Sequence, residues 1–170
     1  AHKTHYVDAY RLKPEKVEVL PLGYDDEIFR PRKEGEESPP RQSSAIFEVL
    51  FFGSFLPLHG TDVIVEAAKI VAGKDPAVHF KLIGSGQTLD RVRVAASGSS
   101  NVKFVGWVPA RELPAVIEAA DVCLGIFGRT EKAGRVVPHK ILQSMGMRKA
   151  VITARTAAAE EFFKHRENIF

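Results

Sequence analysis

Several features that would place this chain in a common functional class are scarce in its sequence or missing from it. Cys123 is the only cysteine among 170 residues, so the chain cannot form an internal disulfide. No apolar run approaches the roughly 20 residues of a membrane-spanning helix. His2 and His5 stand at H-x-x-H spacing, but the histidines form no H-E-x-x-H pattern and no cluster with the spacing of a zinc site. The sequence therefore favours none of the disulfide-rich, membrane-spanning or zinc-dependent classes.

A complete dinucleotide-binding fingerprint is also missing. Gly84-Ser85-Gly86 follows an apolar run, but the first apolar run lacks G-x-G-x-x-G, and no ribose-binding acid follows at the expected distance. This argues against an NAD-dependent dehydrogenase. A lone G-x-G fits an ordinary turn as well as a phosphate-binding turn.

Charge of either sign is not in great excess. The net charge of +3 and the pI of about 9.0 fit an anionic ligand or membrane surface, and equally an ordinary soluble surface. With 45% hydrophobic and 26% charged residues, the chain has the composition of a globular domain. Cys123 lies between apolar neighbours, which predicts a buried core thiol and not a nucleophile.

What the chain does contain is a regular alternation of apolar runs and amphipathic segments from residue 47 onward. We expect strands at Phe47–Gly53, Val78–Gly84, Val102–Gly106, Asp121–Phe127 and Ala150–Ala154. We expect helices at 61–73, 87–96, 111–120, 139–147 and 157–165. The alternation predicts an α/β fold, a Rossmann-like, doubly wound parallel sheet covered by helices on both faces.

The remainder of the chain is expected to lie outside this domain. Residues 1–34 are predicted to be an interdomain lead-in or hinge segment, and residues 35–44, rich in Pro, Ser and charge, a flexible spacer. The nucleotide-binding domain is then 45–170. Because a new extended segment begins near Glu167, we expect the chain to be a fragment of a longer protein.

Ligands of such sheets bind beyond the carboxyl ends of the strands, and that is where the candidate residues lie. Glycines there allow a ligand to approach the backbone, and the first turn of a helix favours an anion. In the first loop, Ser54 and a protonated His59 could donate to a phosphate oxygen, although a tight turn explains the pattern equally well. Lys140 and Gln143 share one face of the helix that follows Pro138, where they could reach a phosphate and a ribose. An ordinary exposed helix face is the alternative there.

Two further loops carry candidates. Trp107 is expected to be a packing residue, although it could stack on a base, and backbone groups at Val108 and Pro109 could meet a planar base. Lys132 and Arg135 lie in a polar loop that either binds a ligand or is simply solvated.

These motifs, in this order, resemble the donor-binding C-terminal domain of the retaining GT-B glycosyltransferases of family 4, also called group 1. Residues 19–25 resemble its V-x-P-x-G-x-D hinge, and residues 52–60 its G-R-L-x-x-x-K-G diphosphate loop. Residues 82–86 resemble its hydrophobic-x-G-x-G turn, residues 105–109 its F-x-G-x-V base-binding region, and residues 120–122 its A-D-V strand entry. Pro138-x-Lys140-x-x-Gln143 resembles the P-x-K-x-x-E variant of its E-x7-E motif.

The sequence departs from the family at charged positions. The family's phosphate-binding Arg and Lys are Ser54 and His59 here, and its second Glu, which binds the ribose hydroxyls, is Gln143. The first Glu of E-x7-E falls at Arg135, so the resemblance suggests that Arg135 or Lys132 serves the diphosphate instead. The set expected to bind the donor is Gly53, Ser54, His59, Gly60, Gly84, Gly86, Val108, Pro109, Lys132, Arg135, Lys140 and Gln143; no residue is assigned a catalytic role.

The resemblance implies a glycosyltransferase of hexosyltransferase type, which moves a sugar from a nucleotide-diphosphate sugar to an acceptor glycan or lipid-linked acceptor. It implies no cofactor and no obligatory metal, a cytoplasmic location at the inner face of the membrane with peripheral contact, a role in cell-envelope biosynthesis, and no nucleic-acid partner. The fragment alone is expected to bind nucleotide weakly and to be inactive. The alternatives are a non-catalytic nucleotide-binding or regulatory Rossmann-like module, a sugar-nucleotide epimerase, and a structural interaction domain.

Overall fold

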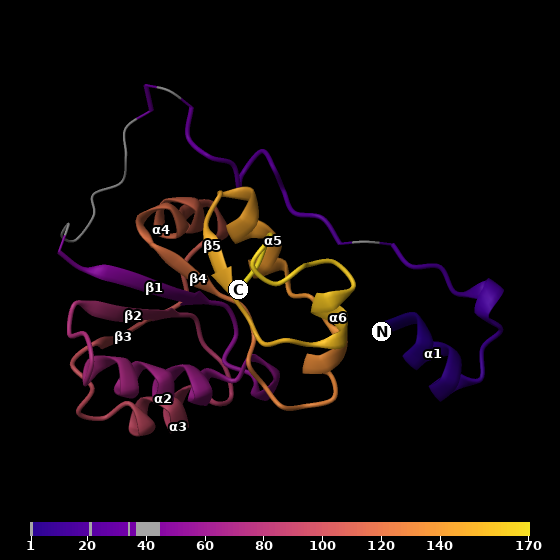
Figure 1. Cartoon of the computed structure of the whole chain (residues 1–170), viewed down its shortest axis with the longest axis horizontal. Coiled ribbons are helices and arrows are strands. Elements are labelled where there is room, and N and C mark those ends of the chain that lie inside the picture. Colours follow the sequence, from indigo (N-terminus) through magenta and orange to yellow (C-terminus); the bar gives the residue numbers. More distant parts are fainter. Residues whose placement is uncertain (1, 21, 34, 37–44) are drawn as a thin grey trace.

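The computed structural model describes residues 2–20, 22–33, 35–36 and 45–170. Its centre is a parallel five-stranded sheet with the strand order β3-β2-β1-β4-β5 (Figure 1). The strands are β1 (Phe47–Phe52), β2 (Val78–Ile83), β3 (Val102–Val105), β4 (Val122–Leu124) and β5 (Ala150–Ile152). The expected α/β, Rossmann-like doubly wound sheet is confirmed.

Helices cover both faces of this sheet. The described helices are α1 (His2–Tyr10), α2 (Thr61–Ala72), α3 (Leu89–Ala95), α4 (Leu113–Ala119), α5 (His139–Gly146) and α6 (Ala157–Glu160). Figure 1 shows α2 and α3 on one face and α4 and α5 on the other. Short 3-10 helices lie at Pro14–Lys16, Pro57–His59, Ala110–Glu112 and Ala133–Arg135.

The apolar strands fill two cores because successive side chains point to opposite faces. In β1, Phe51 packs with α2 and α3, and Leu50 and Phe52 pack on the side of α4 and α5. Cys123 is fully buried in the second of these cores, as its apolar neighbours predicted. Burial raises the pKa of its thiol to about 11, so the thiolate is disfavoured.

The segment before the domain differs from expectation in two ways. The helix α1 was not predicted, because none of its described residues is buried and its apolar residues follow no helical stripe. Farther along, Phe29 is buried in the α4–α5 core, and Arg32 forms an ion pair with Glu118 of α4. Residues 29–32 are therefore docked against the domain. Pro21 of the hinge motif and residues 37–44 of the expected spacer lie outside the described residues, and the division into 1–34, 35–44 and 45–170 stays a prediction.

The last helix is shorter than the predicted 157–165. It ends at Glu160, after which Phe163 turns into the core and Lys164 donates its backbone N–H to the side chain of Asn168 at 2.8 Å. Such a side-chain acceptor competes with continued helix. The remaining predicted elements from residue 47 to 154 are present, with ends within a few residues of expectation.

Candidate functional site

The strand order reverses next to β1, which has β2 on one side and β4 on the other. In open α/β sheets a crevice forms at such a switch point, beyond the carboxyl ends of the strands. The loop after β1 crosses this point and bonds to the segment after β4: Phe127 N–H donates to the carbonyl of His59 at 3.0 Å, and Gly128 N–H to that of Leu58 at 3.2 Å. The crossing fixes the first loop against the start of the β4–α5 connection.

Lys140, in the first turn of α5, lies at this crossing. Its side chain is buried, and its Nζ has no hydrogen-bond partner among the described residues. The Nζ lies 3.8 Å from the centre of the Phe51 ring, and only 2.9 Å from where a Cβ would stand on Gly53. Glycine at the end of β1 is thus what leaves room for the ammonium group.

The burial of Lys140 carries a cost that the described contacts do not offset. An ammonium taken out of water without a partner is disfavoured, and this burial lowers the pKa of Lys140 to about 7. The cation–π contact with Phe51 offsets only part of that cost. A buried, unpaired cation at the switch point of the sheet is a candidate ligand-binding group, and an anion is the ligand that it would favour.

His59 stands beside Lys140 but is not a second cation. Its Nδ1 bonds to the carbonyl oxygen of Ser54, and its ring packs edge-on against Phe51 with 5.8 Å between ring centres. Burial first, and the charge of Lys140 second, lower the pKa of His59 to about 4. The ring is therefore neutral near pH 7, with Nδ1–H donating to Ser54 and Nε2 left as an acceptor. The protonated His59 considered from the sequence does not fit these surroundings.

A small pocket opens on the other side of Gly53. It has a volume of about 170 Å³ and lies at the carboxyl ends of β1, β2 and β3. Its lining residues are all uncharged: Phe52, Gly53, Ser54, Ile83, Gly84, Ser85, Trp107, Val108 and Leu113. Four residues predicted from the sequence therefore share this pocket: Gly53, Ser54, Gly84 and Val108. The expectation that Trp107 is a packing residue is wrong, because 73% of its surface is exposed.

Three predicted glycines have contacts that are explained by the backbone alone. Gly60, at φ 62°, precedes α2, and Gly86, at φ 150°, lies so close to Phe55 that a Cβ would stand 2.7 Å from its amide nitrogen. A Cβ on Gly84, at φ 131°, would stand 2.0 Å from the carbonyl oxygen of Gly53. All three positions need glycine for the course of the chain. Pro109 is half-buried just beyond the pocket residue Val108.

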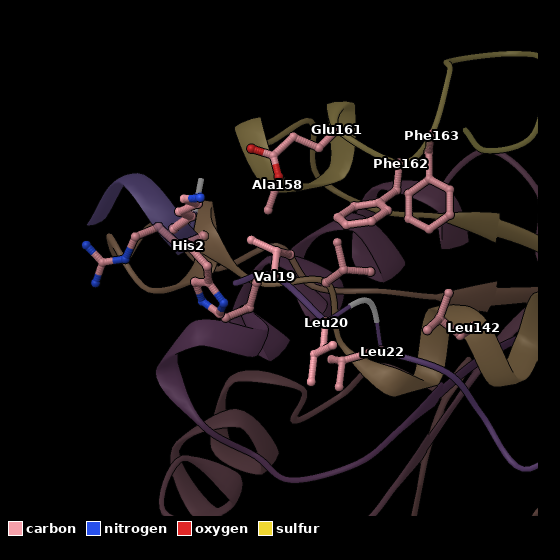
Figure 2. Close-up of a pocket in the computed structure, with 13 residues that line it drawn as sticks. His2, Val19, Leu20, Leu22, Leu142, Ala158, Glu161, Phe162 and Phe163 are labelled. Carbon is pink, nitrogen blue, oxygen red and sulfur yellow. The ribbon is translucent and has the colours of Figure 1, made fainter. Parts of the chain in front are cut away.

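The two predicted cations of the β4–α5 connection, Lys132 and Arg135, have surroundings different from those of Lys140. Arg135 bonds to Glu131 at 3.3 Å and to the ring of His5 at 3.2 Å, and it lines a separate, largely apolar cavity of about 520 Å³. Figure 2 shows this cavity between Val19, Leu20 and Leu22 on one side and Phe162 and Phe163 on the other.

Two further residues of the predicted set are Lys132, which precedes α5 in the sequence, and Gln143, which lies within α5. Lys132 is exposed, and Gln143 is half-buried one turn after Lys140. The structure thus brings Lys140, His59 and Gly53 together and places Arg135 elsewhere; whether any of them binds a donor stays a prediction.

No group of three or more His, Cys, Asp or Glu side chains among the described residues could hold a metal ion. None of the described helices is both long and apolar enough to cross a bilayer.

Comparison with known proteins assigns the family. The model of the family "Glycosyl transferases group 1" matches residues 46–170. The chain belongs to this family. The resemblance drawn from the motifs, to the C-terminal, donor-binding domain of a group 1 glycosyltransferase, is confirmed.

Curated relatives agree with this assignment. A mannosylfructose-phosphate synthase of Agrobacterium fabrum is 28% identical over 130 residues, which cover 68% of this chain and 28% of that protein. A D-inositol 3-phosphate glycosyltransferase of Salinispora arenicola is 30% identical over 135 residues, covering 68% of this chain and 30% of the relative. The chain thus spans less than a third of the length of either relative.

Solved structures share the fold. The crystal structure of Anabaena HepE in complex with UDP and glucose matches 99% of this chain with a TM-score of 0.78 and 22% identity, over 46% of its own length. The C-terminal domain of a glycosyl transferase group 1 family protein (LpcC) from Francisella tularensis matches 87% of this chain and 78% of its own, with a TM-score of 0.65 and 24% identity. The fold is that of one lobe of a GT-B glycosyltransferase.

The sequence reasoning missed one member of the site. Phe51 was read only as a buried strand residue, yet its ring lies against both Lys140 and His59. No feature of the sequence distinguishes it from its apolar neighbours in β1, because the contact depends on where α5 is placed.

Proposed function

We propose that this chain is the donor-binding part of a retaining glycosyltransferase, which transfers a sugar from a nucleotide-diphosphate sugar to an acceptor glycan or a lipid-linked acceptor. One observation carries the proposal: the buried Nζ of Lys140, without a partner among the described residues, beside the glycine that ends β1 at the switch point. An unpaired cation at that place in an α/β sheet suits a diphosphate. The proposal is also supported by the family and by a structural neighbour that was crystallised with UDP and glucose.

In this proposal Lys140 supplies the positive charge that binds the diphosphate and stabilises it as it leaves the sugar. Such preorganised charge is a large contribution to catalysis of group transfer. The exposed Ser54 hydroxyl donates to a phosphate oxygen, and Gly53 allows the ligand to approach the backbone. Gln143, on the same helix as Lys140, bonds the ribose hydroxyls, and Val108 and Pro109 meet the base. Because Lys140 provides the charge, we propose that binding needs no divalent metal.

The acceptor, the retaining stereochemistry and the location at the inner face of the membrane belong to the same proposal. They concern the whole protein, of which a second lobe would hold the acceptor. We expect the 170 residues alone to bind nucleotide weakly and to transfer no sugar.

The test is calorimetric titration of the chain with UDP, GDP and their sugar conjugates, with and without EDTA. We expect Lys140→Met to lose most of the affinity, and Lys69→Met, an exposed lysine of α2 paired with Glu66, to keep it. Met retains the length of the lysine side chain without its charge. Equal affinity of the wild-type protein and Lys140→Met for the nucleotide would contradict the proposal. Loss of binding in EDTA would contradict the proposal that binding needs no divalent metal.

A non-catalytic nucleotide-binding or regulatory module remains the alternative, favoured by the replacement of the family's Arg, Lys and Glu by Ser54, His59 and Gln143. Transfer assays on the full-length protein separate the two. The transferase proposal requires that Lys140→Met lower transfer there, and that NMR of the product find the anomeric configuration of the donor retained. A nucleotide that binds without any transfer would favour the regulatory module.

A further inference from the structure

The ammonium group of Lys140 is covered in this structure. Its Nζ is buried, and Lys140 is not among the residues that line the 170 Å³ pocket bordered by Gly53. A cation that bonds a diphosphate has to come within about 2.8 Å of a phosphate oxygen. The group that covers Lys140 must therefore move before the ligand that we propose can reach it.

The imidazole ring of His59 is that group. Around the point where a Cβ would stand on Gly53, the nearest atoms are Nζ and Cε of Lys140, at 2.9 and 3.2 Å, and then Cε1 of His59 at 3.9 Å. Both side chains also lie against the ring of Phe51. Lys140 is 6% exposed, whereas His59 is half-buried, so His59 is the outer of the two.

The backbone that carries His59 is anchored, but its ring is held weakly. Phe55 is fully buried, and its N–H donates to the carbonyl of Ser85 at 2.8 Å. The carbonyl of His59 accepts from the N–H of Phe127 at 3.0 Å. Among the described residues, the imidazole itself has one hydrogen bond, from Nδ1 to the carbonyl of Ser54. The ring can therefore turn aside while the loop stays in place.

We propose that His59 is a positioning residue, which covers Lys140 in the free protein and turns aside when a diphosphate binds. This inference rests on the proposed function, because it takes the ligand of Lys140 to be a diphosphate. The bond to Ser54 stabilises the covered state, and binding has to break it. A ligand binds less tightly when the competent state of its protein is only partly populated. In this role His59 lowers the affinity for the diphosphate and is not itself a phosphate ligand.

Substitutions of His59 separate the cover from the fold. His59→Ala removes the ring, and His59→Gln keeps a side-chain N–H that can donate to the carbonyl of Ser54. His139→Ala is the matched control, because His139 is an exposed histidine next to Lys140 in the sequence. Calorimetry with UDP and with inorganic pyrophosphate measures the affinity of each variant.

The expected change in affinity is a gain. We expect His59→Ala to bind UDP and pyrophosphate about three- to tenfold more tightly than the wild-type protein, because one hydrogen bond fewer has to be broken. His59→Gln and His139→Ala should stay within about twofold of the wild type. Weaker binding of both ligands by folded His59→Ala would overturn the proposal, because it would make His59 a ligand of the diphosphate.

An NMR titration of Lys140 tests the cover without any ligand. Burial lowers the pKa of Lys140 to about 7, so removing the covering ring should raise that pKa toward its ordinary value. We expect the rise in His59→Ala and not in His59→Gln or His139→Ala. An unchanged pKa of Lys140 in folded His59→Ala would overturn the proposal.

The wild-type protein offers a further measurement, which does not depend on the stability of His59→Ala. In the free protein the Nδ1–H of His59 is bonded to Ser54, and we expect a protected NMR signal from it, assigned with His59→Gln. Binding of UDP should expose this group to water, so that the signal is lost. A UDP complex that keeps the signal would overturn the cover and leave the proposed function standing. The absence of any nucleotide binding to the wild-type chain would overturn the proposed function and this inference with it.

Discussion

Lys140 and Arg135 lie five residues apart in the sequence, but the fold gives them opposite surroundings. Lys140 is buried at the switch point of the sheet, and its Nζ has no hydrogen-bond partner among the described residues. Arg135 is half-buried at an apolar cavity and already bonds to Glu131 and His5. The sequence analysis placed both residues in the set expected to bind the donor, with the diphosphate role of Arg135 implied by the family resemblance. The difference teaches that cations close in the sequence can differ in what they leave available: the described contacts occupy the guanidinium of Arg135 and leave the Nζ of Lys140 unpaired.

The largest expected effect is on nucleotide affinity, which we expect to fall when Lys140 is replaced but not when Arg135 is. We expect Lys140→Met to weaken UDP about 30-fold or more, because a hydrogen-bonded ion pair with the diphosphate is lost. We expect Arg135→Met to change the affinity less than threefold. Calorimetry on the two variants measures both values. A larger loss in Arg135→Met than in Lys140→Met would reverse the comparison.

The second effect is the pH dependence of stability. In the unfolded chain Lys140 has an ordinary lysine pKa, and in the fold burial lowers that pKa to about 7. Between pH 7 and about 10 the unfolded state therefore holds more protons, so the free energy of unfolding rises with pH, by up to about 1.4 kcal/mol per pH unit. Below pH 7 the contribution is constant and unfavourable.

Urea unfolding at several pH values, compared between the wild-type protein and Lys140→Met, isolates this contribution. The wild-type protein should gain stability relative to the variant as the pH rises from 7 to 9. The difference between wild type and Arg135→Met should not change over that range, because arginine stays protonated. If the free energies of unfolding of the wild-type protein and Lys140→Met differed by the same amount at every pH, the ammonium group of Lys140 would be well solvated in the folded wild-type protein.

The third effect is the loss of stability when alanine replaces the glycine that lies next to each cation. Gly53 has φ 134°, and a Cβ there would stand 2.9 Å from the Nζ of Lys140. Gly134, next to Arg135, has nothing within 4 Å of such an atom. We expect Gly53→Ala to lower the free energy of unfolding by about 1–3 kcal/mol and to weaken UDP. Gly134→Ala should stay within about 0.5 kcal/mol of the wild type. Thermal unfolding of both variants checks this, and equal stabilities would show that Lys140 does not press on Gly53.

The smallest effect concerns the partner of Arg135. The side chain of Glu131 is 90% exposed, so its ion pair with Arg135 contributes little. We expect Glu131→Gln to lower the free energy of unfolding by less than about 0.5 kcal/mol and to leave the UDP affinity unchanged. Calorimetry is the sharper readout here. Tighter binding in this variant would indicate that Arg135, once released, reaches the diphosphate after all.

Much of the fold could be predicted because its signals are local. The apolar runs in β1 and β2 and the helical spacing in α2 specify their elements directly, and helix–strand alternation implies the parallel sheet. The helix α1 could not be found from a buried stripe, since none of its described residues is buried. Only its aromatic spacing, with Tyr6 stacked on Tyr10 one turn later, offered a signal.

The candidate site was predictable in its location but not in its electrostatics. The glycines that end β1 and β2 mark the carboxyl edge of the sheet, and Lys140 follows from the P-x-K-x-x-Q motif. That Lys140 lies on Phe51, that His59 is neutral and that Arg135 faces another cavity depend on distances between elements. The exposure of Trp107 likewise depends on how β3 ends against its neighbours, which an apolar sequence pattern does not specify.

The most direct test of the account is a titration of the Lys140 side chain by NMR, with Lys140→Met used to assign its signal. The account predicts a pKa near 7 in the free protein, and a clear rise when UDP is bound, because a diphosphate favours the charged form. An ordinary lysine pKa near 10.5 in both states would contradict it.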